Sequence, residues 1–363
     1  MKIAILFDGA SAYAIKPDLL ILSTVEAIER SLVAEGNTVG YIPVFHDGKW
    51  IEKLRRGKFD LAFNMCEGID GIAHLESSVI SVLELFKIPF TGATSYTASI
   101  CLRKHVINGM LDRAGLPIPK FTAIRRGEPL VSVGFPAIVK PAAEDASLGV
   151  EQRSVVRNMR QLKERVEAML EVWDEVLVQR YIDGREVNVG ILGDTVLPIA
   201  EIDFGKMPAG RWRIVTYTSK WVTGSTDDVG GKPRCPARLP AKVAAEVRSV
   251  ALRAWKMAGG CGYGRVDMRI DDQGRPWILE VNANPDIAPD AGLARMAGVA
   301  GIEYAALIRS ICELALAKGR EVPPPDEWIL AQRLSGVEVR TEPASDLDLF
   351  AGAATAAEVG GEE

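Results

Sequence analysis

The stretch that decides the fold of this chain reads Gly262-Tyr-Gly-Arg-Val-Asp-Met-Arg-Ile-Asp271, then Asp272-Gln-Gly-Arg275, then Pro276-Trp-Ile-Leu-Glu-Val-Asn-Ala-Asn-Pro285. Both long runs are rich in apolar and β-branched residues, and the Asp-Gln-Gly sequence between them is a turn signal. We therefore predict two antiparallel strands that are joined by a hairpin.

The polar residues of this hairpin occupy alternate positions. Side chains two residues apart share a face of a strand, so Arg265, Asp267 and Arg269 project together. On the second strand, alternation places three side chains on one face: Ile278, Glu280 and Asn282. If the two polar faces meet, two carboxylates and an amide oxygen lie beside a guanidinium group, which suits Mg²⁺ bound with a polyphosphate. An ordinary hairpin with a solvated polar face is the alternative.

Length and composition limit the architecture and the partners. A chain of 363 residues, 48% of them hydrophobic, is long enough for two or three domains. The formal charge of −5 offers no basic stripe for nucleic acid, and no apolar run reaches the roughly 18 residues of a membrane span. The start Met1–Gly9 suits a first strand better than a signal peptide. We expect a cytoplasmic protein that binds neither nucleic acid nor membranes.

The first part of the chain predicts a parallel sheet. Apolar runs at residues 3–7, 39–44 and 59–64 read as strands, and amphipathic helices follow Pro17 and span Glu76–Phe86. Strands that alternate with helices favour an α/β layer. No GxGxxG follows the first strand, so a dinucleotide site is unsupported. The loop 64–71 follows a strand's carboxyl end, where open sheets bind ligands, although a plain turn is the alternative.

A second α/β unit is predicted after Ala114-Gly-Leu-Pro-Ile-Pro119. Its strand Phe135–Lys140 ends in a lysine, and the small-residue loop Pro141–Gly149 follows with Ser147 in it. A cation beside several backbone N–H groups can bind phosphate oxygens. Taken alone, this segment favours a surface lysine next to a hairpin turn.

The remaining pattern predicts helices at Met159–Val172, Pro240–Ala258 and Ile302–Ala317, and strands at Val176–Ile182 and Val196–Ile202. The segment Asp183–Leu192 between these strands turns and continues as strand. Residues 203–237 lack a regular pattern, which predicts a long loop of the kind that is either functional or disordered, and Lys220-Trp221 stands out in it. The tail beyond Arg320 has a composition that cannot bury a core, so we expect disorder after about residue 335.

Four segments taken together resemble the ATP-grasp enzymes, and specifically the family of D-alanine–D-alanine ligases and their relatives. The segments are Gly264-Arg-Val-Asp267, Leu279-Glu-Val-Asn-Ala-Asn-Pro285, Val139-Lys-Pro-Ala-Ala-Glu-Asp-Ala-Ser-Leu-Gly149 and Arg180-Tyr-Ile-Asp-Gly-Arg-Glu186. The likeness spans roughly residues 1–318. It implies an α/β protein with a Rossmann-like parallel-sheet domain at residues 1–95 and two α+β ATP-grasp domains, at 96–183 and 184–320, that sandwich ATP. A tail follows at 321–363.

The resemblance implies roles for residues that match the family's phosphate site. Lys104 and Lys140 match the lysines that hold the α- and β-phosphates, and Ser147 lies in the flap that covers them. Lys220 matches the lysine of the mobile loop that closes on the γ-phosphate.

On the adenosine side, Gln179 stands where the family usually has a glutamate that faces the adenine amino group. Glutamine can still accept that hydrogen bond through its carbonyl oxygen. The resemblance implies backbone contacts to adenine from Arg180 and Ile182, and contacts to the ribose hydroxyls from Glu186.

Asp267, Glu280 and Asn282 match the family's magnesium ligands, with Glu280 bridging two ions next to ATP; Mn²⁺ is a possible substitute for Mg²⁺. Arg265 matches the arginine that stabilises the phosphorylated intermediate, so Arg265 and Lys220 are the implied catalytic residues. The implied chemistry has two steps: a carboxylate attacks the γ-phosphate to give an acyl phosphate and ADP, and an amine then attacks the acyl carbon. Positioning and charge neutralisation carry such reactions.

The substrate half departs from the family. The D-alanine ligases carry a glutamate after the first strand that binds the first D-alanine's ammonium group, whereas the run Asp8–Lys16 has no carboxylate at that place. Three further family positions are changed: the His-Gly loop is Cys66–Gly71, a glycine is Asp286, and a serine falls near Ala291.

These departures predict an acceptor, and a donor, other than D-alanine. Glu67 and Asp70 would bind a substrate ammonium group in place of the missing glutamate. Asp286 and Asp290 would favour a cationic or amine acceptor that lacks a free carboxylate.

The leading hypothesis is therefore an ATP-dependent ligase that forms an amide bond on amino-acid or peptide substrates. The alternatives are ATP-dependent intramolecular cyclisation, phosphorylation without ligation, or a true D-alanine–D-alanine ligase. A nucleotide-binding regulatory protein with a decayed active site is the non-enzyme alternative, and the intact Lys140, Arg265 and Asp267 argue against it. The resemblance also suggests a homodimer that forms through the N-terminal domain.

Overall fold

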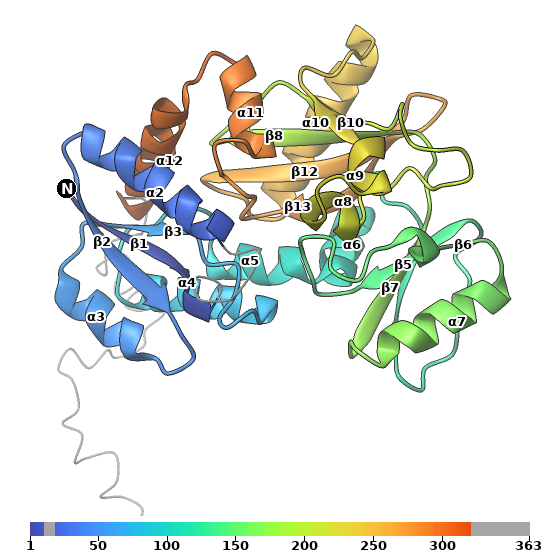
Figure 1. The fold of residues 1–363 in the computed structure, drawn as a ribbon, viewed down its shortest axis with the longest axis horizontal. Coiled ribbons are helices and arrows are strands. Elements are labelled where there is room, and N and C mark those ends of the chain that lie inside the picture. The colour runs from blue at the N-terminus through green and yellow to red at the C-terminus, as the bar shows by residue number, and fades with distance from the viewer. Residues whose placement is uncertain (11–18, 321–363) are drawn as a thin grey trace, which may run out of the picture. The chain divides into compact units, whose positions relative to one another are not determined.

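The computed structural model of the chain describes residues 1–10 and 19–320, with the backbone alone at residues 19, 20, 319 and 320. Within these residues three β-sheets form, and each lies inside one of the segments predicted as domains (Figure 1). The domain boundaries themselves stay predictions. The expected disorder after about residue 335, and most of the run Asp8–Lys16, lie outside the described residues. No described helix has both the length and the apolar character that crossing a membrane requires.

The N-terminal sheet is parallel, which confirms the prediction from alternating strands and helices. Its order is β2-β1-β3, formed by β1 (Lys2–Asp8), β2 (Thr38–Val44) and β3 (Leu61–Asn64). The helices of this segment are α2 (Leu19–Ala34), α3 (Lys49–Gly57) and α4 (Glu76–Leu85), with the 3₁₀ turn η1 (Ala73–Leu75) before α4, and α5 (Ser95–Leu102) follows at its end. Alternate residues of β1 enter two different cores, since Ile3 and Ile5 pack on one side and Ala4 and Leu6 on the other.

The middle sheet is antiparallel and has the order β4-β7-β5-β6. Its strands are β4 (Phe121–Arg125), β5 (Ala137–Pro141), β6 (Val155–Val156) and β7 (Glu175–Arg180), and the 3₁₀ turn η2 (Gln152–Ser154) precedes β6. Helix α7 (Met159–Leu170) begins after Asn158, whose side chain accepts a hydrogen bond from the N–H of Gln161. The helix buries Leu162, Val166 and Met169 against the sheet, as its periodicity predicts.

The C-terminal sheet has the order β11-β10-β8-β12-β13, with β9 also paired to β8. The strands are β8 (Arg185–Leu192), β9 (Thr195–Val196), β10 (Ala200–Asp203), β11 (Lys232–Arg234), β12 (Tyr263–Ile270) and β13 (Pro276–Asn282). Helices α6 (Lys104–Arg113) and α10 (Ala241–Met257) share one apolar core with this sheet. The predicted strand Val196–Ile202 is interrupted between β9 and β10 at Pro198, which has no N–H for a strand ladder.

The predicted hairpin forms, but one assignment within it is wrong. A register shift between Asp267 and Met268 gives β13 one extra residue, Leu279. Ile278 consequently faces the core, where it is fully buried with Val281, and does not share a face with Glu280.

Two other segments bear on the site. Residues 203–237, predicted as one long loop, contain α8 (Tyr217–Trp221) and α9 (Thr226–Gly230), which begin after the capping residues Thr216 and Ser225. Near the C-terminal end of the described chain, α11 (Gly292–Val299) and α12 (Tyr304–Arg320) pack in the same core as β1, β3 and α2.

Candidate active site

The hairpin places the predicted oxygen ligands opposite one another. Asp267 pairs with Glu280, and Arg265 pairs with Asn282, across β12 and β13. Arg265 donates two hydrogen bonds to the Asp267 carboxylate, at 2.7 and 2.8 Å. Asn188, the neighbour of Asp267 on β8, donates a third at 2.6 Å. These contacts fix the Asp267 carboxylate, and Asn188 is a residue that the sequence analysis did not select.

Two lysines from the middle of the chain reach the same hairpin. Lys104, at the start of α6, lies 3.1 Å from Glu280 Oε1 and 3.4 Å from Asp145 Oδ1, and it also donates to the carbonyl of Glu144. Lys140, on β5, donates to the carbonyl of Leu279 at 3.5 Å. The structure therefore brings Lys104, Lys140 and Glu280 together, although 140 residues of sequence separate the last two.

The protonation of this group follows from burial and charge. Burial lowers the pKa of Lys140 to about 8, with the Glu280 carboxylate opposing the shift. Burial would raise the pKa of Glu280, but the ammonium groups of Lys104 and Lys140 and the hydrogen bond from Asp145 together outweigh it and hold that pKa below its ordinary value. Burial raises the pKa of the neighbouring Asp145 to about 6. Lys104 and Glu280 thus form a charged pair at the centre of the site.

On the predicted adenine side, two N–H groups have no hydrogen-bond acceptor among the described residues. Gln179 is 1% exposed, and its Nε2 has no hydrogen-bond partner among the described residues. The N–H of Arg180 is taken by the carbonyl of Lys120 at 2.7 Å. In the described part of the chain no acceptor contacts the N–H of Ile182, whose carbonyl accepts from Arg269. A buried amide without a partner is costly, so a ligand with polar edges fits this place.

Arg269 is a buried residue of the site whose role sequence reasoning missed. It is 2% exposed and donates to Glu186 Oε2 at 2.7 and 3.1 Å. It also donates to the carbonyls of Ile182 and Gly184 and to that of Arg213. One guanidinium group therefore holds the segment 182–184 against β8 and β12. Glu186, predicted to bind ribose, keeps its other carboxylate oxygen, Oε1, without a partner among the described residues.

The predicted flap contains strained backbone. Ala146 and Ser147 have φ values of +54° and +61°, in the left-handed region that non-glycine residues seldom adopt. Trp221 Nε1 on α8 donates to the carbonyl of Ala146 at 3.2 Å. Lys220 is exposed on the same short helix and makes no ion pair with any described residue. The two predicted phosphate-covering segments are thus in direct contact.

An acidic wall borders the site on its N-terminal side. The side chain of Glu67 is exposed, yet displacement of water by the surrounding protein and the charge of Asp286 raise its pKa to about 7. Burial raises the pKa of Glu76, which begins α4, to about 8. Asn284 of the Asn-Ala-Asn-Pro segment donates to Glu76 Oε1 at 3.1 Å and connects this wall to the hairpin.

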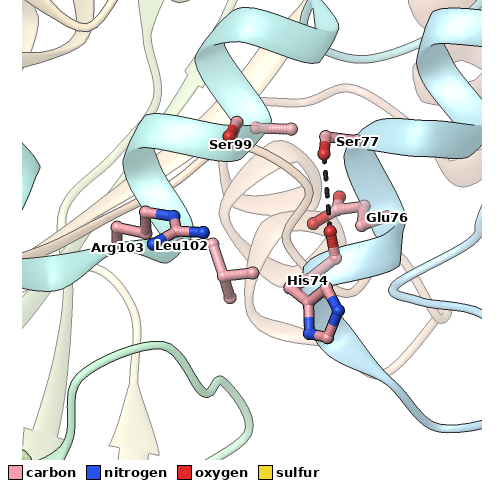
Figure 2. A pocket seen from close by; sticks show the side chains of 7 residues that line it. His74, Glu76, Ser77, Ser99, Leu102 and Arg103 are labelled. Carbon is pink, nitrogen blue, oxygen red and sulfur yellow. Dashed lines mark hydrogen bonds between the residues drawn. The ribbon is translucent and has the colours of Figure 1, made fainter. Parts of the chain in front are cut away.

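Glu76 also lines a small hollow between α4 and α5 with a volume of about 100 Å³. Figure 2 shows Glu76 and His74 on one side of the hollow and Arg103 on the other. Glu76 Oε2 and the Arg103 guanidinium make no hydrogen bond with described residues. Sequence reasoning missed Glu76, because an acidic residue in the first turn is the ordinary start of a helix.

Two of the predicted substrate residues make their contacts with other parts of the chain. The Asp70 carboxylate accepts a hydrogen bond from the N–H of His46 and lies 4.0 Å from its ring. Asp290 is exposed before α11, where its carbonyl accepts from Arg295. Among the predicted carboxylates, Glu67 and Asp286 are therefore the pair that the structure brings to the site.

A carboxylate-bearing hairpin that meets a lysine-bearing antiparallel sheet defines the class of protein: this is an ATP-grasp enzyme. Residues 110–313 match the family model described as D-ala D-ala ligase C-terminus. The chain is 32% identical over 318 residues to a D-alanine–D-alanine ligase of Citrifermentans bemidjiense, which covers 87% of this chain and 97% of that one. It is 31% identical over 260 residues to the uncharacterized protein y4sG of Sinorhizobium fredii, covering 70% and 74% of the two chains.

The fold is also that of a solved D-alanine–D-alanine ligase from Bacillus anthracis complexed with ATP. The TM-score is 0.72 at 24% identity, over 88% of this chain and 99% of that one. The chain belongs to the D-alanine–D-alanine ligase family. It is an ATP-dependent, ADP-forming carboxylate–amine ligase of that type, which confirms the resemblance and the fold class expected from the sequence.

Proposed function

We propose that this enzyme joins a carboxylate to an amine on amino-acid or peptide substrates other than a pair of D-alanines. The observation that carries the proposal is the contrast between the two halves of the site. The ATP half has lysines and oxygen ligands in contact, whereas the substrate half is lined by the carboxyl groups of Glu67, Glu76 and Asp286. An ammonium group that binds among these carboxyl groups favours their ionised forms, and their negative charge then repels a second free carboxylate.

In this proposal Lys104 and Lys140 hold the α- and β-phosphates of ATP, and Lys220 approaches the γ-phosphate from α8. In the described part of the chain Gln179 Nε2 and the N–H of Ile182 have no partner, which supports an adenine ring between the middle and C-terminal sheets. Glu186 Oε1, which has no partner among residues 1–10 and 19–320, is available for the ribose hydroxyls, and Arg269 fixes Oε2.

The donor set of the hairpin fits Mg²⁺. Mg²⁺ bound with phosphates takes one or two carboxylates, and Asp267 faces Glu280 while Asn282 adds an amide oxygen. These three residues would hold one or two ions, with Mn²⁺ as a substitute, and the ions would neutralise charge on the phosphates. Arg265, which Asp267 holds through two hydrogen bonds, would stabilise the acyl phosphate.

The proposed reaction needs no protein nucleophile. The substrate carboxylate attacks the γ-phosphorus and ADP leaves, and the amine then attacks the acyl carbon and phosphate leaves. The work of the protein is to orient the reactants, to supply the cations of Lys104, Lys140 and Arg265, and to exclude water.

A screen of ADP release over pairs of amino acids and amines, with mass analysis of the products, tests this function. We expect release with a pair that contains a cationic amine, and a product whose mass equals the two substrates minus water. Loss of water from a single substrate would instead establish cyclisation. Glu67→Gln should raise the Michaelis constant of the substrate whose ammonium group it binds, and Asp286→Gly should raise that of the amine acceptor. Unchanged constants for both substrates would end the acidic-wall argument.

A true D-alanine–D-alanine ligase is the second candidate, because the relative from Citrifermentans bemidjiense carries that name. ADP release with D-alanine as the only amino acid, accompanied by the dipeptide, would establish it. A homodimer that forms through residues 1–95 is a further part of the proposal, and light scattering after size-exclusion chromatography measures it.

A further inference from the structure

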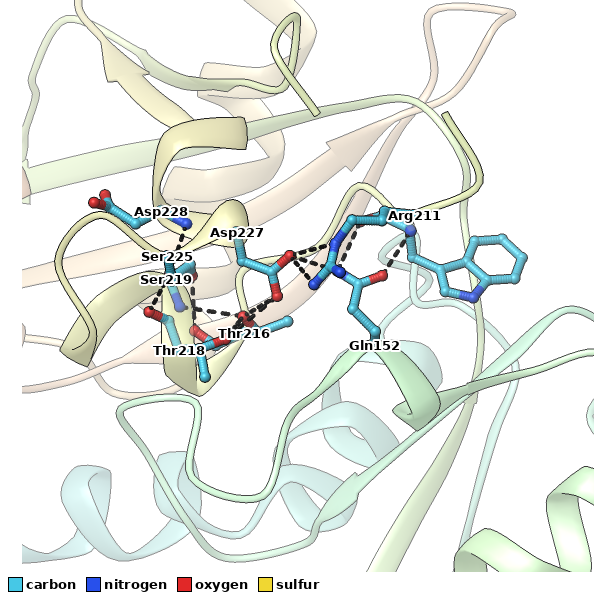
Figure 3. A network of polar contacts seen from close by, with 9 residues as sticks. Gln152, Arg211, Thr216, Thr218, Ser219, Ser225, Asp227 and Asp228 are labelled. Carbon is cyan, nitrogen blue, oxygen red and sulfur yellow. Dashed lines mark hydrogen bonds and ion pairs between the residues drawn. The ribbon is translucent and has the colours of Figure 1, made fainter. Parts of the chain in front are cut away.

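The segment that carries Lys220 is organised around one buried carboxylate. Asp227, on α9, is 3% exposed. It accepts hydrogen bonds from the hydroxyl groups of Thr216 and Thr218 at 2.8 and 3.3 Å and from Arg211 at 2.9 and 2.6 Å (Figure 3). A fifth bond comes from Gln152 Nε2 at 3.2 Å. The hydrogen of Thr218 is shared, because its hydroxyl group also lies 2.9 Å from that of Thr216. Since a buried carboxylate is stable only when it is paired, these donors fix the position of Asp227.

Gln152 belongs to a distant part of the chain, the turn η2 before β6. Its side-chain amide makes three hydrogen bonds with the segment 203–237. Nε2 donates to Asp227 and to the carbonyl of Trp212 at 3.2 Å, and Oε1 accepts from the N–H of Trp212 at 2.7 Å. Both the amide nitrogen and the amide oxygen of Gln152 therefore form hydrogen bonds with the segment 203–237.

Helix α8 is docked on the neighbouring flap at both of its ends. The N–H of Tyr217 donates to the carbonyl of Val150 at 2.9 Å, and Trp221 Nε1 donates to the carbonyl of Ala146 at 3.2 Å. Lys220 lies on the helix between these two contacts. The docking thus determines where its ammonium group can reach.

Asp227 controls the start of this helix. The side chain of Thr216 caps α8 by accepting from the N–H of Ser219 at 3.2 Å, and the same hydroxyl group donates to Asp227. A hydroxyl group has one hydrogen to donate, so the bond to Asp227 orients the lone pairs that serve the cap. The orientation of α8 therefore follows from the position of Asp227.

We infer that Asp227 and Gln152 are positioning residues that hold α8, and with it Lys220, over the nucleotide phosphates. The inference rests on the role of Lys220 in the proposed function. Asp227 touches no reacting atom and acts through Thr216 and the helix, while Gln152 fixes the segment to the part of the chain that carries Lys140.

Calorimetric binding of MgATP tests the inference without any amino-acid substrate. Lys220→Ala should raise the dissociation constant about tenfold, the effect of one lost bond to a charged group. Asp227→Asn and, from the opposite side of the contact, Gln152→Ala should raise it by a similar factor. The double variant Lys220→Ala/Asp227→Asn should bind no more weakly than Lys220→Ala alone.

Asp203→Asn is the matched control. It makes the same chemical change in the same segment, but Asp203 bonds to Arg234 and to the N–H of Gly205, away from the flap. The dissociation constant of Asp203→Asn for MgATP should match that of the unmodified protein. A cooperative thermal unfolding transition should show that every variant is folded.

Three results would overturn the inference. The first is a dissociation constant for MgATP that rises in Lys220→Ala but stays unchanged in both Asp227→Asn and Gln152→Ala. This result refutes the positioning role and leaves the proposed function intact. Full additivity in the double variant shows that Asp227 does not act through Lys220. No change in Lys220→Ala removes the assigned role of Lys220, and the inference with it.

Discussion

Replacing Arg269 with methionine should destabilise the protein by about 3–5 kcal/mol, the cost of breaking a buried ion pair from one side. The partners explain the size. Arg269 and Glu186 are 2% and 8% exposed, so the carboxylate that remains has little water around it. The carbonyls of Ile182, Gly184 and Arg213 lose a donor at the same time. Methionine fills part of the volume but supplies no hydrogen bond.

Urea-induced unfolding measures this loss. Arg160→Met on α7 is the control, because its partner Glu164 is one turn away and both side chains are more than half exposed, so about 0.5 kcal/mol or less should be lost. In the double variant Arg269→Met/Glu186→Leu the stranded charge is absent, and most of the stability should return. A loss below about 1 kcal/mol for Arg269→Met would refute the reasoning.

Three further perturbations have defined outcomes. The pKa of Glu76 is raised from 4.5 to about 8, so the folded protein retains a proton that the unfolded chain loses, and stability falls as pH rises across that window. The fall is worth at most roughly 5 kcal/mol. Glu76→Gln should lack it when the free energy of unfolding is compared at pH 5 and pH 8.5. Gly184→Ala should lower the melting temperature, because its Cβ would lie 2.0 Å from the carbonyl oxygen of Ile270, and normal melting would contradict the close approach. Asp267→Asn should weaken Mn²⁺ binding at least about tenfold in a paramagnetic resonance titration with ATP present, and equal binding would exclude Asp267 as a ligand.

The elements that sequence predicted well are those whose partners are close in the chain. The hairpin 262–285 has a turn signal and alternating polar residues, so Asp267 and Glu280 could be placed on facing strands. The bulge at Leu279 has no comparable signal, because one extra residue leaves the composition of a strand unchanged. Helix α3 was not predicted, since Trp50 and Leu54 are its only fully buried residues.

The parts of the site that sequence did not reveal depend on distant pairing. Arg269 is 83 residues from Glu186, and Gln152 is 75 residues from Asp227. In each case the individual residue types are ordinary for a surface, and only the tertiary packing makes them buried partners. The family resemblance supplied the candidate ATP residues, but it could not supply contacts such as these, because Arg269, Gln152 and Asp227 lie outside the quoted motifs.

The core that contains β1 also contains α12, and this arrangement has a consequence for biosynthesis. Ile3 and Ile5 pack in one cluster with Leu307 and Ile308, so the ribosome adds roughly 300 residues before the first strand acquires its final cover. Until then α2 covers only part of this face of the nascent N-terminal sheet, and the apolar surface that stays open is the kind that chaperones bind. A chain terminated before α12 should therefore aggregate, even though every residue named in the active site would already have been made.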